Sequence, residues 1–170
     1  MSSSNAATTS NEVIIPEADK VANPKTFLFM HVISCTVQVG GLFGAIYTPI
    51  HYFLKRRKEP TLSFSNFLNT RLPQYIWRGT TIGFLVGSIL YYGKARTFTQ
   101  NNFDDRAFRI KHNIHCNMWQ QAWLGSVVLG GLTGLILKKP EMGIALGHAF
   151  GTILFAGLTA AGVKPLQRRD

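Results

Sequence analysis

The chain has 170 residues, a length typical of one domain, and its 18 Lys and Arg against 8 Asp and Glu give a net charge of +10. The basic residues fall in short stretches between long apolar segments, which argues against a nucleic-acid-binding surface and favours contact with anionic lipid headgroups. Two cysteines are too few for a disulfide scaffold.

The first part of the chain is rich in Ser, Thr and Asn and contains no arginine, so we expect a disordered tail over residues 1–25. A secretory signal would need a basic start and an apolar core, and a mitochondrial transit peptide would need arginines and few acids. Glu12, Glu17 and Asp19 fit neither pattern. We therefore expect any targeting information to lie within the apolar segments.

The first apolar segment predicts a membrane-spanning helix over residues 26–54, longer than the roughly 20 residues that cross a bilayer. Asn23 followed by Pro24 has the pattern of a helix start, with an N-cap side-chain oxygen and then proline at the first helical position. Pro49 is expected to bend or end this helix near the membrane surface. A basic run, residues 55–58, closes the segment.

The second span is predicted over residues 75–93, with aromatic side chains at both ends as in the interface belts of membrane proteins. Before it, residues 61–74 carry apolar side chains at helical spacing, which predicts a short helix on the membrane surface or a plain loop. After it, residues 94–115 are expected to form a polar loop. The belt residues are Tyr75 and Trp77 at one end and Tyr91 and Tyr92 at the other.

Two further spans are predicted over residues 116–137 and 141–163, joined by a very short turn at residues 138–140. So short a connection requires the two helices to run antiparallel as a hairpin. A basic tail, residues 164–170, ends the chain. The predicted fold is an all-α membrane protein with four transmembrane helices in one domain, residues 26–163, and both termini on the same side.

Glycines recur in steps of four residues in all four predicted spans, so they line one face of each helix. Lipid tails are as apolar as leucine, so hydrophobicity does not drive helices together in a bilayer, whereas small residues let backbones make close contact. The pattern predicts tight packing, either within the chain or with a partner. The predicted packing residues are Gly40, Gly44, Gly79, Gly83, Gly87, Gly130, Gly134, Gly143, Gly147 and Gly151.

A cluster of His112, His115 and Cys116 comes closest to a metal site, but no second pair of ligands completes a tetrahedral set. We interpret these three as polar residues at a membrane entrance. No nucleophile–base pair, paired carboxylates or phosphate-binding loop accompanies them. The sequence predicts no metal, no catalytic residue, no cofactor and no small-molecule substrate.

Two polar residues, Gln38 and His148, lie near the middle of predicted spans, and Arg78 lies one turn into the second span. Polar groups in a membrane are costly and often functional, but they also form hydrogen bonds between helices worth about 1 kcal/mol. We interpret Gln38 and His148 as structural, and we expect Arg78 to snorkel to the headgroups. A polar path through the bundle is the alternative role for all three.

The short glycine-striped spans, the expected internal targeting and the basic loop after the first span together resemble the Tim17/Tim22/Tim23 superfamily of mitochondrial inner-membrane proteins. The resemblance covers about residues 26–163 and implies either a protein-import subunit or an accessory subunit of respiratory complex I. Import members carry an arginine, an acidic residue four positions later and then a glycine pair. Here Arg109 is followed four positions later by Asn113, and the pair at residues 130–131 comes too late. Residues 104–109 look more like the non-import members.

The predicted function is a non-catalytic accessory subunit of complex I or of a respiratory supercomplex, which packs against membrane subunits and lipid. A translocase subunit is the alternative and should present a polar lateral cavity. A small transporter should show an inverted repeat with broken helices, and we detect no repeat beyond the glycine steps of the second and fourth spans.

Bound phospholipid, cardiolipin in particular, is expected at basic residues close to the membrane surface. The denser positive charge of the first and third loops predicts that these face the matrix, with both termini in the intermembrane space. The predicted headgroup-binding residues are Lys55, Arg56, Arg57, Lys58, Arg78, Lys138 and Lys139.

Overall fold

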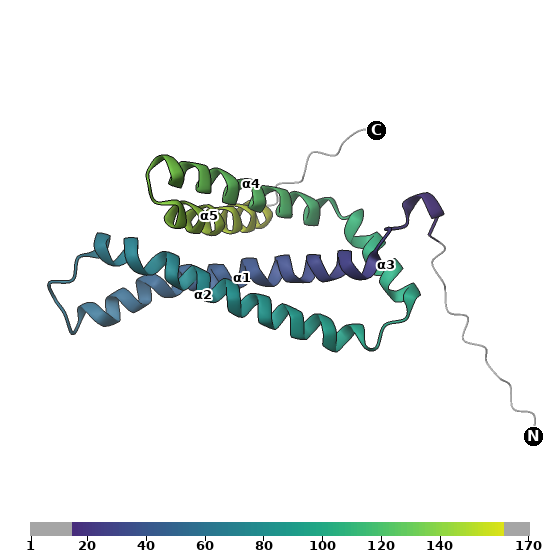
Figure 1. The fold of residues 1–170 in the computed structure, drawn as a ribbon, viewed down its shortest axis with the longest axis horizontal. Helices are drawn as coiled ribbons and strands as arrows, with labels where there is room; N and C mark the ends of the chain where they lie inside the picture. Colours follow the sequence, from purple (N-terminus) through teal and green to yellow (C-terminus); the bar gives the residue numbers. More distant parts are fainter. Residues whose placement is uncertain (1–14, 162–170) are drawn as a thin grey trace, which may run out of the picture.

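The computed structural model describes residues 15–161, and every regular element in that range is a helix (Figure 1). The prediction of an all-α protein is thereby confirmed for the described part of the chain. Predictions for residues 1–14 and 162–170, including the basic tail, lie outside it. The elements are η1 (Glu17–Asp19), α1 (Pro24–Arg56), α2 (Phe64–Ala95), α3 (Gln100–Lys111), α4 (Ile114–Ile136) and α5 (Pro140–Ala160).

Helix α1 begins at Pro24 as predicted, although the Asn23 side chain makes no capping hydrogen bond. The expectation that Pro49 could end the helix is wrong, because α1 continues to Arg56. The turn after Pro49 is held by packing: Tyr52 is only 3% exposed and lies against aromatic rings of α2. Tertiary contacts thus outweigh the loss of one backbone hydrogen bond.

Helix α2 is longer than its predicted span, because residues 61–74 are not a separate surface helix. The first turns of α2 pack antiparallel against the end of α1, where Phe67 is 4% exposed and lies 5.5 Å from Tyr52, centroid to centroid. The Tyr52 hydroxyl also donates to the Leu62 carbonyl at 3.3 Å. Pro73 sits inside the helix and is itself buried.

The predicted polar loop at residues 94–115 contains a helix, α3. It buries Phe103 (4% exposed) and Ala107 (0% exposed), one turn apart, in contact with α1. The segment is polar enough to be taken for a loop, because only this narrow stripe of small and aromatic residues faces the bundle.

Helices α4 and α5 form a hairpin with the very tight turn that the sequence predicts. The backbone NH of Lys139 donates to the Gly134 carbonyl at 2.7 Å, and that of Lys138 to the Leu135 carbonyl at 3.1 Å. These two bonds form a Schellman motif, whose left-handed position is usually glycine. Lys138 occupies it here, with φ of 58°.

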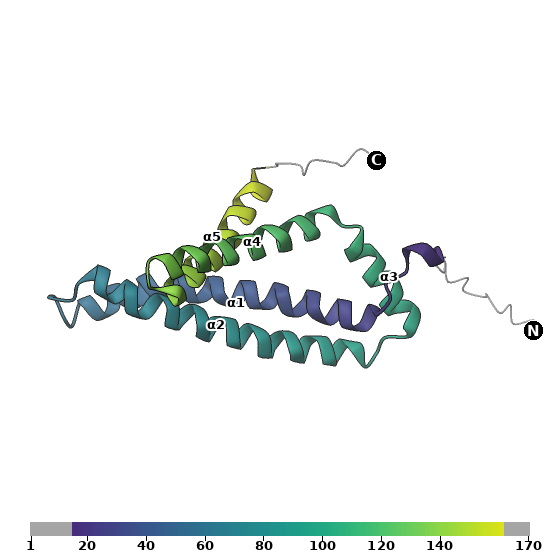
Figure 2. The same cartoon turned by 45° about the horizontal axis from the view of Figure 1, so that its top comes forward.

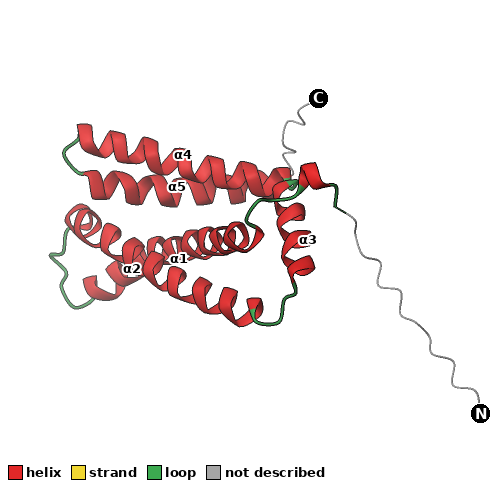
Figure 3. Cartoon of the chain, turned by 45° about the vertical axis from the view of Figure 1, so that its right-hand side comes forward, coloured by secondary structure: helices red, strands yellow, loops and turns green. Residues whose placement is uncertain are grey.

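The molecule is built from two antiparallel hairpins, α1–α2 and α4–α5, which point in the same direction (Figure 1). Both interhelical turns lie at one end, and α3 lies at the other end, where it connects the hairpins (Figure 3). Turning the molecule shows α3 leading from α2 into α4 beside the start of α1 (Figure 2). The second hairpin contacts the first mainly through α5.

One helix among the described residues, α1, is long and apolar enough to cross a membrane. Only 22% of its 18-residue apolar window is buried inside the molecule, whereas the core helix of a compact soluble domain would be mostly buried. The other three predicted spans coincide with parts of α2, α4 and α5. That these helices also cross a membrane stays a prediction.

Candidate functional site

The crossing of α1 and α2 is a contact between glycine backbones. A Cβ atom on Gly40 would collide with the carbonyl oxygen of Gly79, and a Cβ on Gly79 would collide with that of Gly40. One turn further along, a Cβ on Gly83 would meet the Thr36 carbonyl oxygen, and a Cβ on Gly87 the Thr36 hydroxyl. At Gly40, Gly79 and Gly83 the obstructing atoms belong to backbone, so no side chain larger than hydrogen fits there while the helices keep their present separation.

The crossing of α4 and α5 has the same construction. Cβ atoms on Gly130 and Gly143 would each collide with the other residue's carbonyl oxygen. A Cβ on Gly147 would meet the Ser126 carbonyl oxygen, and a Cβ on Gly151 would lie 2.8 Å from the Ser126 Cβ. All four long helices therefore use their glycine stripes within the chain, one of the two alternatives that the sequence left open.

These contacts reveal an internal repeat of the helical hairpin that the sequence analysis did not detect. Helices α1 and α2 have 33 and 32 residues, whereas α4 and α5 have 23 and 21, so no single sequence register aligns both hairpins. Because the hairpins point the same way, the repeat is parallel and not inverted. The matching positions are Thr36 and Ser126, Gly40 and Gly130, Gly44 and Gly134, Tyr75 and Lys139, Gly79 and Gly143, Gly83 and Gly147, and Gly87 and Gly151.

A second kind of contact joins the two hairpins through His148, which is 5% exposed. Its Nε2 donates to the Gln38 carbonyl oxygen at 3.3 Å, and its ring meets the edge of Trp123 at a centroid distance of 5.4 Å. The imidazole occupies the space above Gly41, where a Cβ would collide with it. Gly41 was not among the predicted packing residues, because it lies beside the four-residue stripe.

Gln38 is 1% exposed, and its Nε2 donates to the Ser34 hydroxyl at 3.2 Å. Its Oε1 and the Trp123 Nε1 are buried without a hydrogen-bond partner in the described part of the chain. His148 therefore contacts a carbonyl group and an aromatic ring, and it pairs with no titratable side chain of residues 15–161. This geometry favours the structural role over the polar path.

A further polar contact between the hairpins involves His31, which the sequence analysis did not single out. Gln120 Nε2 lies 2.8 Å from His31 Nδ1, and the other ring nitrogen lies 3.8 Å from the Cys35 sulfur. The available signal was the same as for His148, a polar side chain within an apolar run.

Most of the predicted headgroup residues lie at the end of the molecule that carries both turns (Figure 1). Lys55 pairs with Glu59 at 3.4 Å, and the Arg56 guanidinium lies over the Tyr52 ring at 5.8 Å. The other predicted headgroup residues at this end, all exposed, are Arg57, Lys58, Lys138 and Lys139.

Arg78 is exposed on α2, with its guanidinium 5.9 Å from the centroid of the Tyr75 ring. It borders an open groove of about 410 Å³ beside the α1–α2 crossing. A larger groove of about 630 Å³ follows the α4–α5 crossing and reaches Asn69 and Lys139. Both grooves are lined mostly by apolar atoms.

His112, His115 and Cys116 do not converge on one point. The His112 Nδ1 bonds to the Phe108 carbonyl at 2.9 Å, and His115 is exposed. Within residues 15–161, no three His, Cys, Asp or Glu side chains form a group that could hold a metal ion.

A search of curated proteins gave no match for the chain. A family model described as "Protein of unknown function (DUF1757)" matches residues 6–158, which is most of the sequence. The matched region includes both hairpins except the last residues of α5. The chain therefore belongs to the family described as Protein of unknown function (DUF1757).

Proposed function

We propose that this protein is a non-catalytic accessory subunit of a respiratory complex of the mitochondrial inner membrane, complex I or a supercomplex. In this proposal α1, α2, α4 and α5 all span the bilayer, and the protein packs between partner helices and lipid. The resemblance to the Tim17/Tim22/Tim23 superfamily supports the location in the mitochondrial inner membrane and the membership of a respiratory complex.

The observation that carries the proposal is the apolar outer surface of both hairpins. Large hydrophobic side chains are exposed on each long helix, for example Phe43 (66%), Ile89 (72%), Leu129 (66%) and Phe150 (62%). Because the glycine stripes already pack within the chain, these outer faces are left for lipid or partner helices. A bilayer removes them from water, which an isolated monomer in solution cannot do.

A structural role fits the grooves better than a conducting one. A translocase subunit should offer a polar cavity to a hydrophilic segment, but the lining of both grooves is mostly apolar. The parallel direction of the hairpins also differs from the inverted repeat of many transporters.

In this proposal the two turns face the matrix and both termini face the intermembrane space. The exposed cations at the turns would then meet acidic headgroups, cardiolipin in particular, at about 1 kcal/mol per charge. Neutralising residues 55–58 together should reduce the cardiolipin that co-purifies with the complex, measured by mass spectrometry.

The function can be tested by depleting the protein and following respiration and protein import over time. An accessory role predicts less intact complex with unchanged turnover per remaining complex, because assembly and the chemical step have separate free energies. Ile89→Leu should restore assembly in the depleted strain, whereas Gly147→Leu should not. An import defect that precedes the loss of complex would favour the translocase alternative, and lower turnover in intact complex would contradict both.

A further inference from the structure

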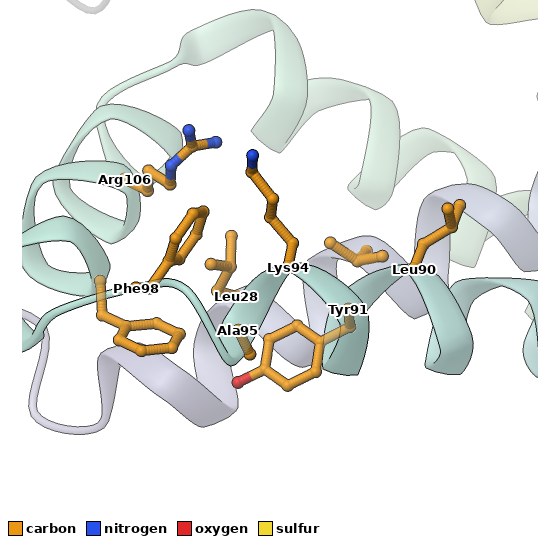
Figure 4. A pocket seen from close by; sticks show the side chains of 9 residues that line it. Leu28, Leu90, Tyr91, Lys94, Ala95, Phe98 and Arg106 are labelled. Atoms are coloured by element: carbon orange, nitrogen blue, oxygen red, sulfur yellow. The ribbon is translucent and has the colours of Figure 1, made fainter.

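A small cavity of about 130 Å³ lies where α3 crosses the ends of α1 and α2, opposite the turns (Figure 4). Its apolar walls include Leu28 of α1, Leu90 of α2 and the ring of Phe98. Phe103 and Ala107 fix α3 over this corner, since both are buried. The cavity is therefore bounded by packed elements on several sides.

Two cationic side chains lie near the face of the same aromatic ring, Phe98, at this cavity. The Arg106 guanidinium carbon lies 4.5 Å from the Phe98 centroid, and the Lys94 Nζ lies 5.9 Å from it. Figure 4 shows both side chains extending to the same side of the cavity. A third cation, Lys25, lies over the Phe103 ring at 5.4 Å. Positive charges close to one another repel, and an anion bound between them would offset that repulsion.

In the described part of the chain, the nearby carboxylates form no ion pair with these cations. Asp105 pairs with Arg109 at 2.9 Å, and Asp104 accepts a hydrogen bond from Gln100 at 3.2 Å. Among the described residues, neither Lys94 nor Arg106 forms an ion pair within 4.0 Å. Their positive charge is thus available to an external anion.

The cavity lies at the level where headgroups would be. Tyr91, at its edge, packs against Phe29 at 5.1 Å and against Tyr92 at 5.4 Å, and its hydroxyl donates to the Lys25 carbonyl at 2.9 Å. Such aromatic groups mark the interface in membrane proteins. An anion bound here would have positively charged side chains on one side and apolar side chains on the other.

We propose that this corner binds the phosphodiester of an anionic phospholipid between Lys94 and Arg106, an inference that rests on the proposed membrane-spanning function. The apolar walls favour a lipid over free phosphate, because a phosphate ion has no group to place against Leu28 and Leu90. The volume is too small for a whole lipid, so the acyl chains lie outside, along the exposed apolar surface of α2.

The proposal can be tested by native mass spectrometry of the full-length protein in detergent, mixed with equal amounts of phosphatidylglycerol and phosphatidylcholine. The protein should retain phosphatidylglycerol preferentially, and Lys94→Gln and Arg106→Gln should each lower that preference about fivefold. Arg109→Gln, on the same helix but paired with Asp105, is the matched control and should change little. Lys94→Arg should keep the preference.

Equal retention of the two lipids, or an equal loss in Arg109→Gln, would overturn the site. Displacement of phosphatidylglycerol by millimolar inorganic phosphate would assign it to a free anion and also contradict the proposal. Extraction of membranes with alkaline carbonate tests the proposed membrane-spanning function independently of the lipid site. Release of the wild-type protein from membranes would contradict the spanning bundle, whereas the lipid comparison judges the site alone.

Discussion

Single glycines set the separation of the helices, so adding one methyl group at a crossing should destabilise the protein. In Gly40→Ala the new Cβ meets the Gly79 carbonyl oxygen, a backbone atom that cannot rotate away. We expect a loss of about 1–3 kcal/mol, the usual cost of overpacking. The free energy of unfolding can be measured by titration from mild detergent into dodecyl sulfate.

Gly93→Ala is the matched control, because nothing lies within 4 Å of a Cβ at that position of α2. It should leave the free energy of unfolding unchanged or slightly higher. Equal losses in the two variants would show that the crossing tolerates larger residues.

The contact of Gly41 with His148 predicts coupling between two residues from different hairpins. Gly41→Ala should cost about 1–3 kcal/mol, because its Cβ overlaps the imidazole. With His148→Ala in the background, the same change should cost less than about 0.5 kcal/mol. A double-mutant cycle on unfolding measures this directly, and additive losses would mean that the hairpins do not meet at these residues.

At the scale of residues, the sequence located the glycines that pack but not what they pack against. Four-residue spacing identifies a helix face, and Gly40 and Gly79 are both on such faces. It cannot pair one face with another, because pairing depends on the register of the two helices. Gly41 was missed because it lies beside the four-residue stripe, and its partner His148 is on a helix distant in sequence. His31, which pairs with Gln120 of α4, was missed although it is, like His148, a polar side chain within an apolar run.

At the scale of elements, the α4–α5 turn carries avoidable strain at Lys138, whose φ is 58°. Glycine adopts this left-handed conformation without the Cβ clash that other residues suffer. We expect Lys138→Gly to raise the free energy of unfolding by about 1 kcal/mol or less. Lys139→Gly, which relieves no positive φ, should give no gain, and equal effects in the two variants would contradict the assignment.

The sequence predicted where the long helices lie, but it misjudged their limits and connections. Pro49 suggested that the first helix ends near this residue, yet α1 continues to Arg56, where the packing of Tyr52 against aromatic rings of α2 stabilises the last turns. The same aromatic cluster packs the start of α2 against the end of α1, so α2 begins at Phe64 and includes most of residues 61–74. Helix α3 was missed because its buried stripe, Phe103 and Ala107, is too narrow to give an apolar pattern. In each case long-range contacts overrode local preference.

At the scale of the whole molecule, the repeat explains how two hairpins of different length share one architecture. The same set of glycine contacts recurs in both hairpins. Helix α2 returns the chain to the end where α1 begins, and α3 connects it there to α4. The second hairpin can thus start from the same end as the first. This arrangement gives the proposed membrane topology a simple consequence: both turns lie on one side, and α3 lies on the other.

Cysteine accessibility in mitoplasts tests that topology most directly. In a protein carrying Cys35→Ala and Cys116→Ala, single cysteines would be introduced by Lys58→Cys, Lys138→Cys or Asn102→Cys, all at exposed positions. A bulky, membrane-impermeant maleimide should label only the Asn102→Cys protein in α3, and the two turn variants only after detergent is added. Labelling of all three without detergent, or of one turn but not the other, would contradict a bundle of two parallel hairpins that spans the inner membrane four times.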